Sequence, residues 1–319
     1  MQQQIRPPVQ QASGFAPRKG RLWKEIWKHK AFYLFMLPGV VWFIIFAYIP
    51  LYGLTLAFKD YRFDLGMFGS PWAGFKYFHE FFVYYQFKEI IRNTIVISVL
   101  KLLIGFPAPI LLAILLNEVR HALFKRSVQT ISYLPHFISW VVVATLMIRI
   151  FTPDGGPVNE LMASFGMERV FFMGEKAYFY PMIVLSAVWK GIGFGSIIYL
   201  AAIAGIDPQL YEAARIDGAG RFRQILHITL PGLKTVAVTL FILDVGGLMY
   251  AGFEQLYLLS NPAVASIGTI LDTHVIQSGL KQGRFGYATA AGLFQSVIGL
   301  ILVLIVNRVS KRVNGVSIW

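Results

Sequence analysis

The sequence predicts an all-α integral membrane protein with six transmembrane helices. Hydrophobic residues make up 56% of the 319 residues and charged residues only 14%, whereas soluble domains average about 25% charged residues. Six apolar segments each approach the roughly 20 residues that cross the hydrocarbon core of a bilayer. Lysines and arginines gather at the ends of these segments, so the net charge of +13 indicates membrane orientation and not nucleic-acid binding.

A polar and basic tail, residues 1–30, precedes the first span. The apolar run after it exceeds the roughly 7 to 15 residues of a signal peptide, so we expect a retained anchor. The membrane domain is expected to cover residues 31–312 and to leave a short tail, residues 313–319. The expected spans are Phe32–Phe58, Asn93–Asn117, Ile131–Phe151, Phe179–Gly205, Leu233–Leu258 and Tyr287–Asn307.

Several of these segments carry local signals. Pro38 and Pro50 can kink the first span, because proline lacks a backbone hydrogen-bond donor. The loop after this span is rich in aromatic residues over 69–87, which suits either a helix at the lipid headgroups or a packed outer loop. Asn261 and Pro262 are turn formers and mark the loop before the sixth span.

The distribution of basic residues predicts the orientation. The two termini, the loop between the second and third spans and the loop between the fourth and fifth carry about twice as many lysines and arginines as the three opposite loops. Basic loops remain on the cytoplasmic side of a membrane. Both termini and the loop at residues 207–231 are therefore expected in the cytoplasm.

The polar loop at residues 207–231 is the most informative part of the chain. Asp207 is a good N-cap and Pro208 suits the first helical position. Gly218 and Gly220 bracket Ala219 and can supply the turn that ends this first short helix, since glycine adopts left-handed dihedrals without a steric penalty. A second short helix follows, and Pro231 is expected to close it before the fifth span. One face of the first helix carries mostly small side chains that allow close approach, namely Leu210, Ala213, Ala214 and Asp217.

Two charges are expected deep in the membrane, Lys190 in the fourth span and Asp244 in the fifth. A charge at that depth costs a few kcal/mol, so such residues face the protein interior and find a partner. We expect these two to face each other or a shared watery cavity, either in a transport pathway or as a structural pair. Lys101 in the second span is a weaker candidate, because a lysine nearer the interface can extend toward water.

Glycines around Lys190 favour a solute site. Gly191, Gly193 and Gly195 permit close helix contact or local unwinding near the middle of the membrane. Aromatic side chains can stack on sugar rings and polar ones can bind hydroxyl groups, which together suit an oligosaccharide pocket. The expected pathway residues are Trp189, Lys190, Tyr199, Asp244, Tyr250, Glu254 and Gln255.

No enzyme signature is present in the sequence. It lacks cysteine, its histidines are scattered, and neither a metalloprotease nor a nucleophile motif occurs. No catalytic residue, metal site or cofactor is expected in this chain. The phosphate-binding loop of ATPases is also missing, so any dependence on ATP must come from a partner.

The residues of the polar loop resemble a known motif. Glu212-Ala213-Ala214, then Asp217-Gly218-Ala219, then a hydrophobic helix ending at Leu230-Pro231, resemble the EAA loop of the membrane subunits of binding-protein-dependent ABC importers. The resemblance extends over nearly the whole chain from Phe35. YIPLYGLTLAFKDY, NEVRHALFKRSVQTISYLPHFISWVV, GFEQLYLLSNP and the closing SIW are similar to carbohydrate permeases of the MalF/MalG type, especially the LplB-like branch.

This resemblance implies a type I ABC importer permease fold and a transport function. It implies a heterodimer with a second homologous permease, two ATPase subunits that hold ATP-Mg, and an extracytoplasmic protein that delivers an oligosaccharide. Glu212 would meet basic residues of the ATPase groove and Asp217 would help to hold the loop. Ala213, Ala214, Gly218 and Ala219 would complete the coupling surface.

Three alternatives stay open at this point. The first is an ABC importer permease for a solute other than a sugar, the second a membrane enzyme, and the third an anchor or receptor without transport. Co-purification of an ATPase would separate these classes.

Overall fold

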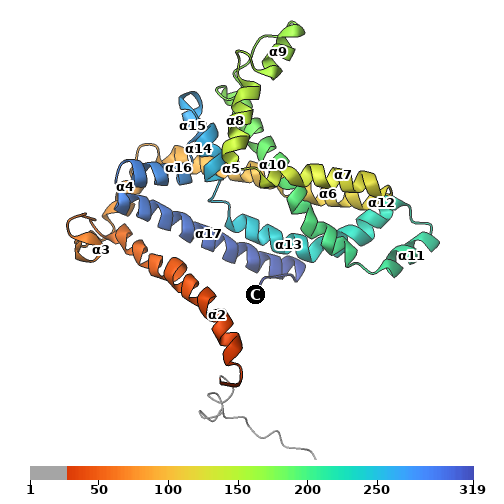
Figure 1. Cartoon of the computed structure of the whole chain (residues 1–319), viewed down its shortest axis with the longest axis horizontal. Coiled ribbons are helices and arrows are strands. Elements are labelled where there is room, and N and C mark those ends of the chain that lie inside the picture. The colour runs from red at the N-terminus through yellow and green to blue at the C-terminus, as the bar shows by residue number, and fades with distance from the viewer. Residues whose placement is uncertain (1–26) are drawn as a thin grey trace, which may run out of the picture. The chain divides into compact units, whose positions relative to one another are not determined.

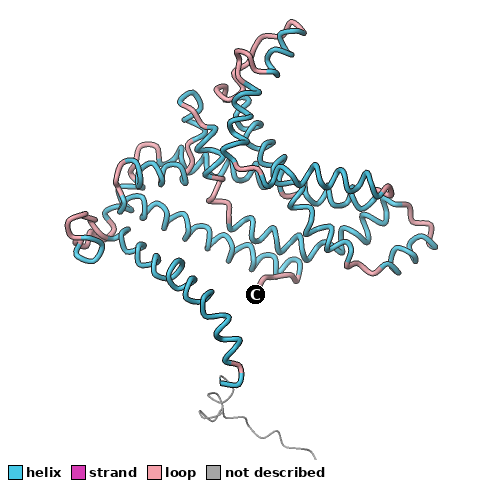
Figure 2. The backbone as a smooth tube through the Cα atoms, in the orientation of Figure 1, coloured by secondary structure: helices cyan, strands magenta, loops and turns pink. Residues whose placement is uncertain are grey.

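The computed structural model describes residues 27–319, so nearly all of the predicted tail at residues 1–30 lies outside the described residues. The chain divides into two units, residues 1–54 and 55–319. Within the described part, regular structure is helical apart from one isolated bridge between Lys59 and Trp72 (Figures 1 and 2). The prediction of an all-α membrane protein is confirmed.

The first span is one helical segment, Lys30–Phe58. It begins as α2 (Lys30–Phe43), continues as the π-helical turn η1 (Ile44–Tyr48) and ends as the 3₁₀ helix η2 (Ile49–Phe58). Pro38 lies inside α2 and does not end it.

The remaining helices belong to the second unit. The long ones are α5 (Phe87–Gly105), α6 (Pro107–Glu118), α7 (Ala122–Tyr133), α8 (Trp140–Phe151), α10 (Lys176–Ala204), α13 (Leu230–Gly246) and α17 (Phe285–Asn314). The short ones are α3 (Gly66–Gly69), α4 (Lys76–Phe82), η3 (Leu134–Phe137), α9 (Pro157–Ser164), α11 (Pro208–Ile216), α12 (Arg221–Gln224), η4 (Ile225–Thr229), α14 (Phe253–Leu259), η5 (Pro262–Val264), α15 (Ala265–Gly268), α16 (Leu271–Ile276) and η6 (Gln277–Lys281). Five helical segments of the described residues are long and apolar enough to cross a membrane, and a bent pair makes a sixth.

The third span is the bent pair, and its predicted course was wrong. In place of one helix over Ile131–Phe151, α7 with η3 meets α8 at an angle of 102°, and α8 turns away from α7 in Figure 1. Ser139 is extended at the corner and its side chain accepts a hydrogen bond from the backbone of Val142, which starts α8 as a new helix.

The fifth span also departs from the prediction. The helix that was expected to run to Leu258 ends at Gly246, and the chain is unwound over residues 247–252 before α14 begins. Gly252 has a φ of +95°, a conformation that side chains other than hydrogen disfavour. The apolar sequence is continuous here, so hydropathy alone did not reveal the break.

At its other end, the fifth span begins earlier than predicted. One helical segment runs from Arg221 to Gly246 through α12, η4 and α13, so Pro231 does not close the second short helix. The π-helical turn η4 lies just before this proline. A proline ring clashes with the carbonyl group four residues back, here that of His227, and the wider π turn relieves that clash.

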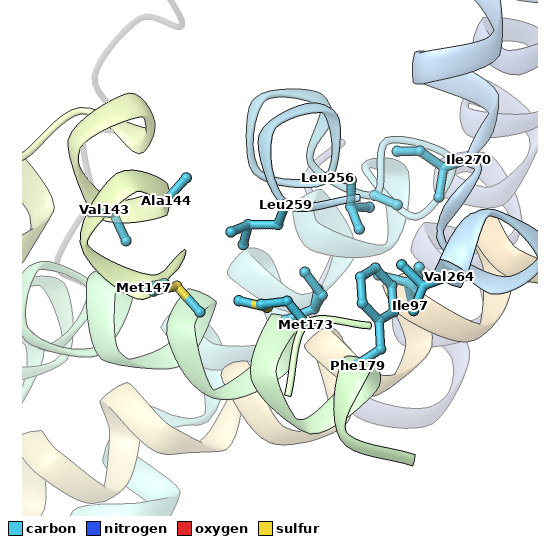
Figure 3. Packing of buried hydrophobic residues seen from close by; sticks show 12 residues of the cluster. Ile97, Val143, Ala144, Met147, Met173, Phe179, Leu256, Leu259, Val264 and Ile270 are labelled. Carbon is cyan, nitrogen blue, oxygen red and sulfur yellow. The ribbon is translucent and has the colours of Figure 1, made fainter. Parts of the chain in front are cut away.

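The largest hydrophobic core joins five parts of the second unit. Buried side chains from α5, α8, α10, the segment 251–270 and, with Met173, the loop before α10 meet there, as Figure 3 shows. Phe179 and Leu256 are completely buried within it. This core lies next to the unwound part of the fifth span and therefore helps to fix its position.

The aromatic loop is partly packed. Phe81 of α4 is fully buried against Phe87, Phe294 and Tyr287, which favours the packed outer loop for this segment. Behind it, His274 shares a 2.9 Å hydrogen bond with the hydroxyl group of Tyr287.

Candidate coupling loop and transport pathway

The loop at residues 207–231 begins with a capped helix, as predicted. Asp207 Oδ1 accepts a hydrogen bond from the backbone of Gln209 at 2.9 Å, and Pro208 is the first residue of α11. An aspartate at this position satisfies one of the backbone donors that a helix leaves unpaired at its start.

The end of α11 is a Schellman motif built on Gly218. The Ala219 N–H donates to the Ala214 carbonyl at 2.8 Å, and the Gly218 N–H donates to the Arg215 carbonyl at 3.1 Å. Gly218 has a φ of +75°. These are the two bonds and the left-handed residue that define this way of ending a helix. Of the two glycines predicted to supply this turn, Gly218 takes the left-handed conformation and Gly220, with a φ of −66°, does not.

The predicted coupling residues lie on an open surface. Glu212, Ala213, Asp217 and Gly218 are exposed, and Ala214 and Ala219 are partly buried. Sequence reasoning missed two larger apolar side chains beside them, Ile216 and Phe222, which are 87% and 73% exposed. Their signal was present, because large apolar side chains in a charged loop outside the membrane are unusual unless a partner covers them.

A cavity of about 810 Å³ lies beside α11. Its polar lining includes Glu212 and Arg215 of α11, Glu118 at the end of α6, Arg120 after it, and Arg221 of α12. Arg221 and Glu118 form an ion pair at 3.8 Å. The loop therefore offers charges of both signs next to its exposed apolar side chains.

Lys190 neither pairs with Asp244 nor lines the cavity that Asp244 lines, so neither of the two arrangements that we expected is found. Its ammonium lies at the end of η3, at the corner of the third span, and donates to three backbone carbonyl groups. The acceptors are those of Pro135 at 3.2 Å, His136 at 2.7 Å and Ile138 at 2.6 Å. A lysine in this position satisfies carbonyl groups that the end of a helix leaves unpaired.

The neighbouring glycines explain how α10 approaches this corner. A Cβ atom on Gly193 would lie 2.0 Å from the carbonyl oxygen of Ser132 in α7, whereas one on Gly191 would meet nothing within 4 Å. His136 also stacks on Phe194, with ring centroids 4.0 Å apart. Of the glycines predicted to permit close contact, Gly193 therefore does so against backbone.

Asp244 lines a different cavity. This cavity has a volume of about 310 Å³ and lies at the end of α13, where the fifth span unwinds. Tyr250, Lys101 and Ser98 contribute the other polar side chains. The Ser98 hydroxyl is buried and has no hydrogen-bond partner among the described residues. An unpaired buried hydroxyl is costly, so it marks a place where a polar ligand or water is favoured.

The other predicted pathway residues divide into two groups. Trp189, Glu254 and Tyr250 are exposed, and the Tyr250 hydroxyl lies 3.1 Å from that of Ser296. Tyr199 is instead buried in a hydrophobic cluster.

Gln255 is buried, and its side-chain amide forms hydrogen bonds to other residues of the protein. Its Nε2 donates to the Ile183 carbonyl and the Ser186 hydroxyl, each at 2.8 Å, and its Oε1 accepts from Lys101. As placed here, Gln255 supports the fold and has no amide donor left for a sugar hydroxyl, whereas we expected it to bind sugar hydroxyl groups.

Comparison with known proteins places the whole chain. The family described as "binding-protein-dependent transport system inner membrane component" matches residues 105–315. YteP of Bacillus subtilis, a polygalacturonan/rhamnogalacturonan transport system permease protein, is 47% identical over 95% of this chain and 94% of its own. LplB of the same organism is 44% identical over 96% of both chains.

A solved structure shows the same architecture. A chain of the bacterial alginate ABC transporter, crystallised with alginate pentasaccharide-bound periplasmic protein, has 41% identity and a TM-score of 0.86. The match covers 93% of this chain and 100% of that one. The predicted type I importer fold is thereby confirmed, and the reading as an enzyme is excluded by the relatives, which are permease proteins. This chain belongs to the family of binding-protein-dependent transport system inner membrane components and is a multi-pass permease subunit of a sugar-type ABC transporter.

Proposed function

We propose that this chain forms half of the translocation pathway of an ATP-driven oligosaccharide importer. Support for the substrate class comes from the relatives, which are named for polygalacturonan, rhamnogalacturonan and alginate. All three are polysaccharides, and the matches extend over nearly the full length of the chain.

The proposed partners are a second homologous permease, two ATPase subunits that bind ATP-Mg, and an extracytoplasmic sugar-binding protein. Both termini and the loop at residues 207–231 would lie in the cytoplasm, where the ATPases are. The observation that carries this proposal is the surface of α11. Small side chains, Glu212 and the exposed Ile216 lie together on a short helix between two spans, which suits docking in a groove that contains basic residues.

The proposed pathway passes the cavity at the end of α13. Asp244, Tyr250 and Ser98 offer a carboxylate and two hydroxyl groups there, and such groups bind the hydroxyl groups of sugars. Trp189 and Glu254 are exposed side chains that extend the proposed lining. Lys190, Tyr199 and Gln255 would act on the pathway only through the packing that they support.

Reconstitution of the complete transporter tests this proposal. The chain would be co-expressed with its partner permease, ATPase and binding protein, and ATP-dependent uptake of labelled oligosaccharides would be measured in proteoliposomes. Glu212→Ala is expected to abolish uptake while the protein still inserts, and Glu160→Ala, an exposed acid on α9, is the matched control. If uptake were inhibited by a competing non-sugar solute and by no oligosaccharide, the chain would instead be a permease for a solute other than a sugar.

The orientation can be tested separately. The chain contains no cysteine, so Glu212→Cys creates a single labelling position in this subunit. A membrane-impermeant maleimide is expected to react with it in inside-out vesicles and not in intact cells. Labelling in intact cells would place the loop on the outer face and refute coupling to a cytoplasmic ATPase.

A further inference from the structure

Two carbonyl groups in the break of the fifth span are satisfied by side chains from other helices. Inside a membrane an unpaired backbone group costs several kcal/mol, so unwound segments persist only where the protein supplies partners. The Met249 carbonyl accepts from Gln295 Nε2 at 2.7 Å, and the Ala251 carbonyl accepts from Lys101 Nζ at 2.6 Å. The donors come from α17 and α5, which hold the break from two helices.

Lys101 is the more highly connected of the two donors. Besides the Ala251 carbonyl it donates to Gln255 Oε1 at 2.6 Å, and thus joins the unwound segment to the start of α14. Gln255 in turn donates to α10 through the Ile183 carbonyl and Ser186. One ammonium group therefore links the second span, the break and, through Gln255, the fourth span.

The charge of Lys101 is balanced locally. Asp272 of α16 interacts electrostatically with Lys101, and its Oδ1 accepts a 2.6 Å hydrogen bond from Gln295 Nε2. The same Gln295 group binds the Met249 carbonyl. Asp272 is therefore hydrogen-bonded to one donor at the break, Gln295, and interacts at longer range with the charge of the other, Lys101.

Gly252 leaves the space next to the backbone that this ammonium occupies. A Cβ atom at residue 252 would lie 2.8 Å from Lys101 Nζ, and the φ of +95° disfavours any side chain there. The ammonium occupies the space next to the backbone that a glycine provides.

Resting on the proposed function, we infer that Lys101 is a positioning residue for transport: its ammonium fixes the unwound segment 247–252 and thereby places Tyr250 and Asp244 at the cavity. Two of its three donors are used on the protein. Lys101 therefore shapes the pathway through the fifth span.

Cysteine labelling in the complete transporter tests this inference. Met249 is only 3% exposed, so Met249→Cys is a single reporter that reacts with N-ethylmaleimide only when the break opens. Adding Lys101→Met is expected to raise the labelling rate roughly tenfold or more, because two charge-assisted hydrogen bonds are lost. Lys101→Arg should retain most of the protection. Lys88→Met, an exposed lysine on the same helix α5, should leave the rate unchanged.

A second test uses Gly252→Ala, alone and combined with Lys101→Met, so that the inference does not depend on the assembly of Lys101→Met alone. Gly252→Ala should also speed labelling of the reporter, because its Cβ displaces the ammonium. If Lys101 holds the break, the labelling rate of the double variant Gly252→Ala/Lys101→Met should rise by less than the product of the two single increases. The reason is that the clash of the new Cβ with the ammonium exists only while the lysine is present.

Several results would overturn the inference. An unchanged labelling rate in Lys101→Met with a raised KM for the oligosaccharide would assign Lys101 to substrate binding. Equal labelling and equal uptake would leave it without a role at the break. Absence of oligosaccharide uptake by the unmodified transporter would refute the proposed function alone, because the labelling comparison needs no substrate.

Discussion

Replacing Gly218 tests whether the end of α11 depends on one backbone conformation. Gly218 and Gly220 are two residues apart, and a Cβ atom at either would meet nothing within 4 Å. They differ in φ, which is +75° at Gly218 and −66° at Gly220. Alanine at residue 218 should therefore cost about 1–2 kcal/mol from its left-handed conformation alone, and alanine at residue 220 close to nothing.

This cost should appear in the Schellman motif itself. A penalty of about 1–2 kcal/mol lowers the equilibrium constant for the closed motif by a factor of roughly 5 to 30. Hydrogen exchange measured by mass spectrometry on peptides covering residues 208–224 should speed up by that factor in Gly218→Ala. The exchange rate in Gly218→Asn should lie between those of the unmodified protein and Gly218→Ala, since asparagine tolerates the left-handed region better than alanine. ATP-driven uptake should decline in the same order while membrane insertion stays normal.

The control decides how the result is interpreted. If Gly220→Ala accelerated exchange as much as Gly218→Ala, the effect would come from loss of general loop freedom and not from the φ of Gly218. If Gly218→Val changed neither exchange nor uptake, the motif would have no part in coupling, and the proposed role of α11 would fail.

Three further predictions concern residues of α10 and α16. Gly193→Ala should reduce assembly strongly, because its Cβ would overlap the Ser132 carbonyl, whereas Gly191→Ala should assemble normally; immunoblots of purified complexes compare them. Lys190→Met should lower the apparent unfolding temperature of the complex without changing the order of substrate preference, since its ammonium binds carbonyl groups at the corner of the third span; a changed preference would contradict this assignment. Burial, and next the charge of Arg284, lower the pKa of His274 to about 4 from 6.5. On acidification the unfolded chain therefore binds a proton at this histidine before the folded chain does, and stability should be lost as the pH falls from about 6.5 to 4. His274→Gln should lose that part of the pH dependence, and a pH profile identical to that of the unmodified protein would refute the prediction.

The sequence predicted which segments are helical and apolar better than it predicted where those helices bend, break or end. The capped start of α11 and its end at Gly218 depend on local backbone chemistry, and both were found where the residues indicated. The unwound segment 247–252 contains apolar residues that satisfy a hydropathy criterion as well as a helix does. Only Gly246, Gly247 and Gly252 gave a signal for the break, and that signal does not identify where the partners of the freed carbonyl groups come from.

The intramembrane lysines show the same limit. A lysine within an apolar segment indicates that a partner exists, and Asp244 was the nearest candidate by depth. In the folded chain Lys190 and Lys101 each bind backbone carbonyl groups at a place where a span bends or unwinds. Such acceptors have no signature in the sequence, since any residue supplies a carbonyl group once its helix ends.

The uninterrupted helix from Arg221 to Gly246 has a mechanical consequence. Its 26 residues make a rod about 39 Å long, with α11 and its following turn before one end and the unwound segment after the other. A tilt of about 10° at the docking end would swing the far end by about 7 Å, given the rise per residue of a helix. The only irregular turn along the rod is η4, near the end that carries the loop, so motion of the α-helical part beyond that turn would reach the cavity with little loss.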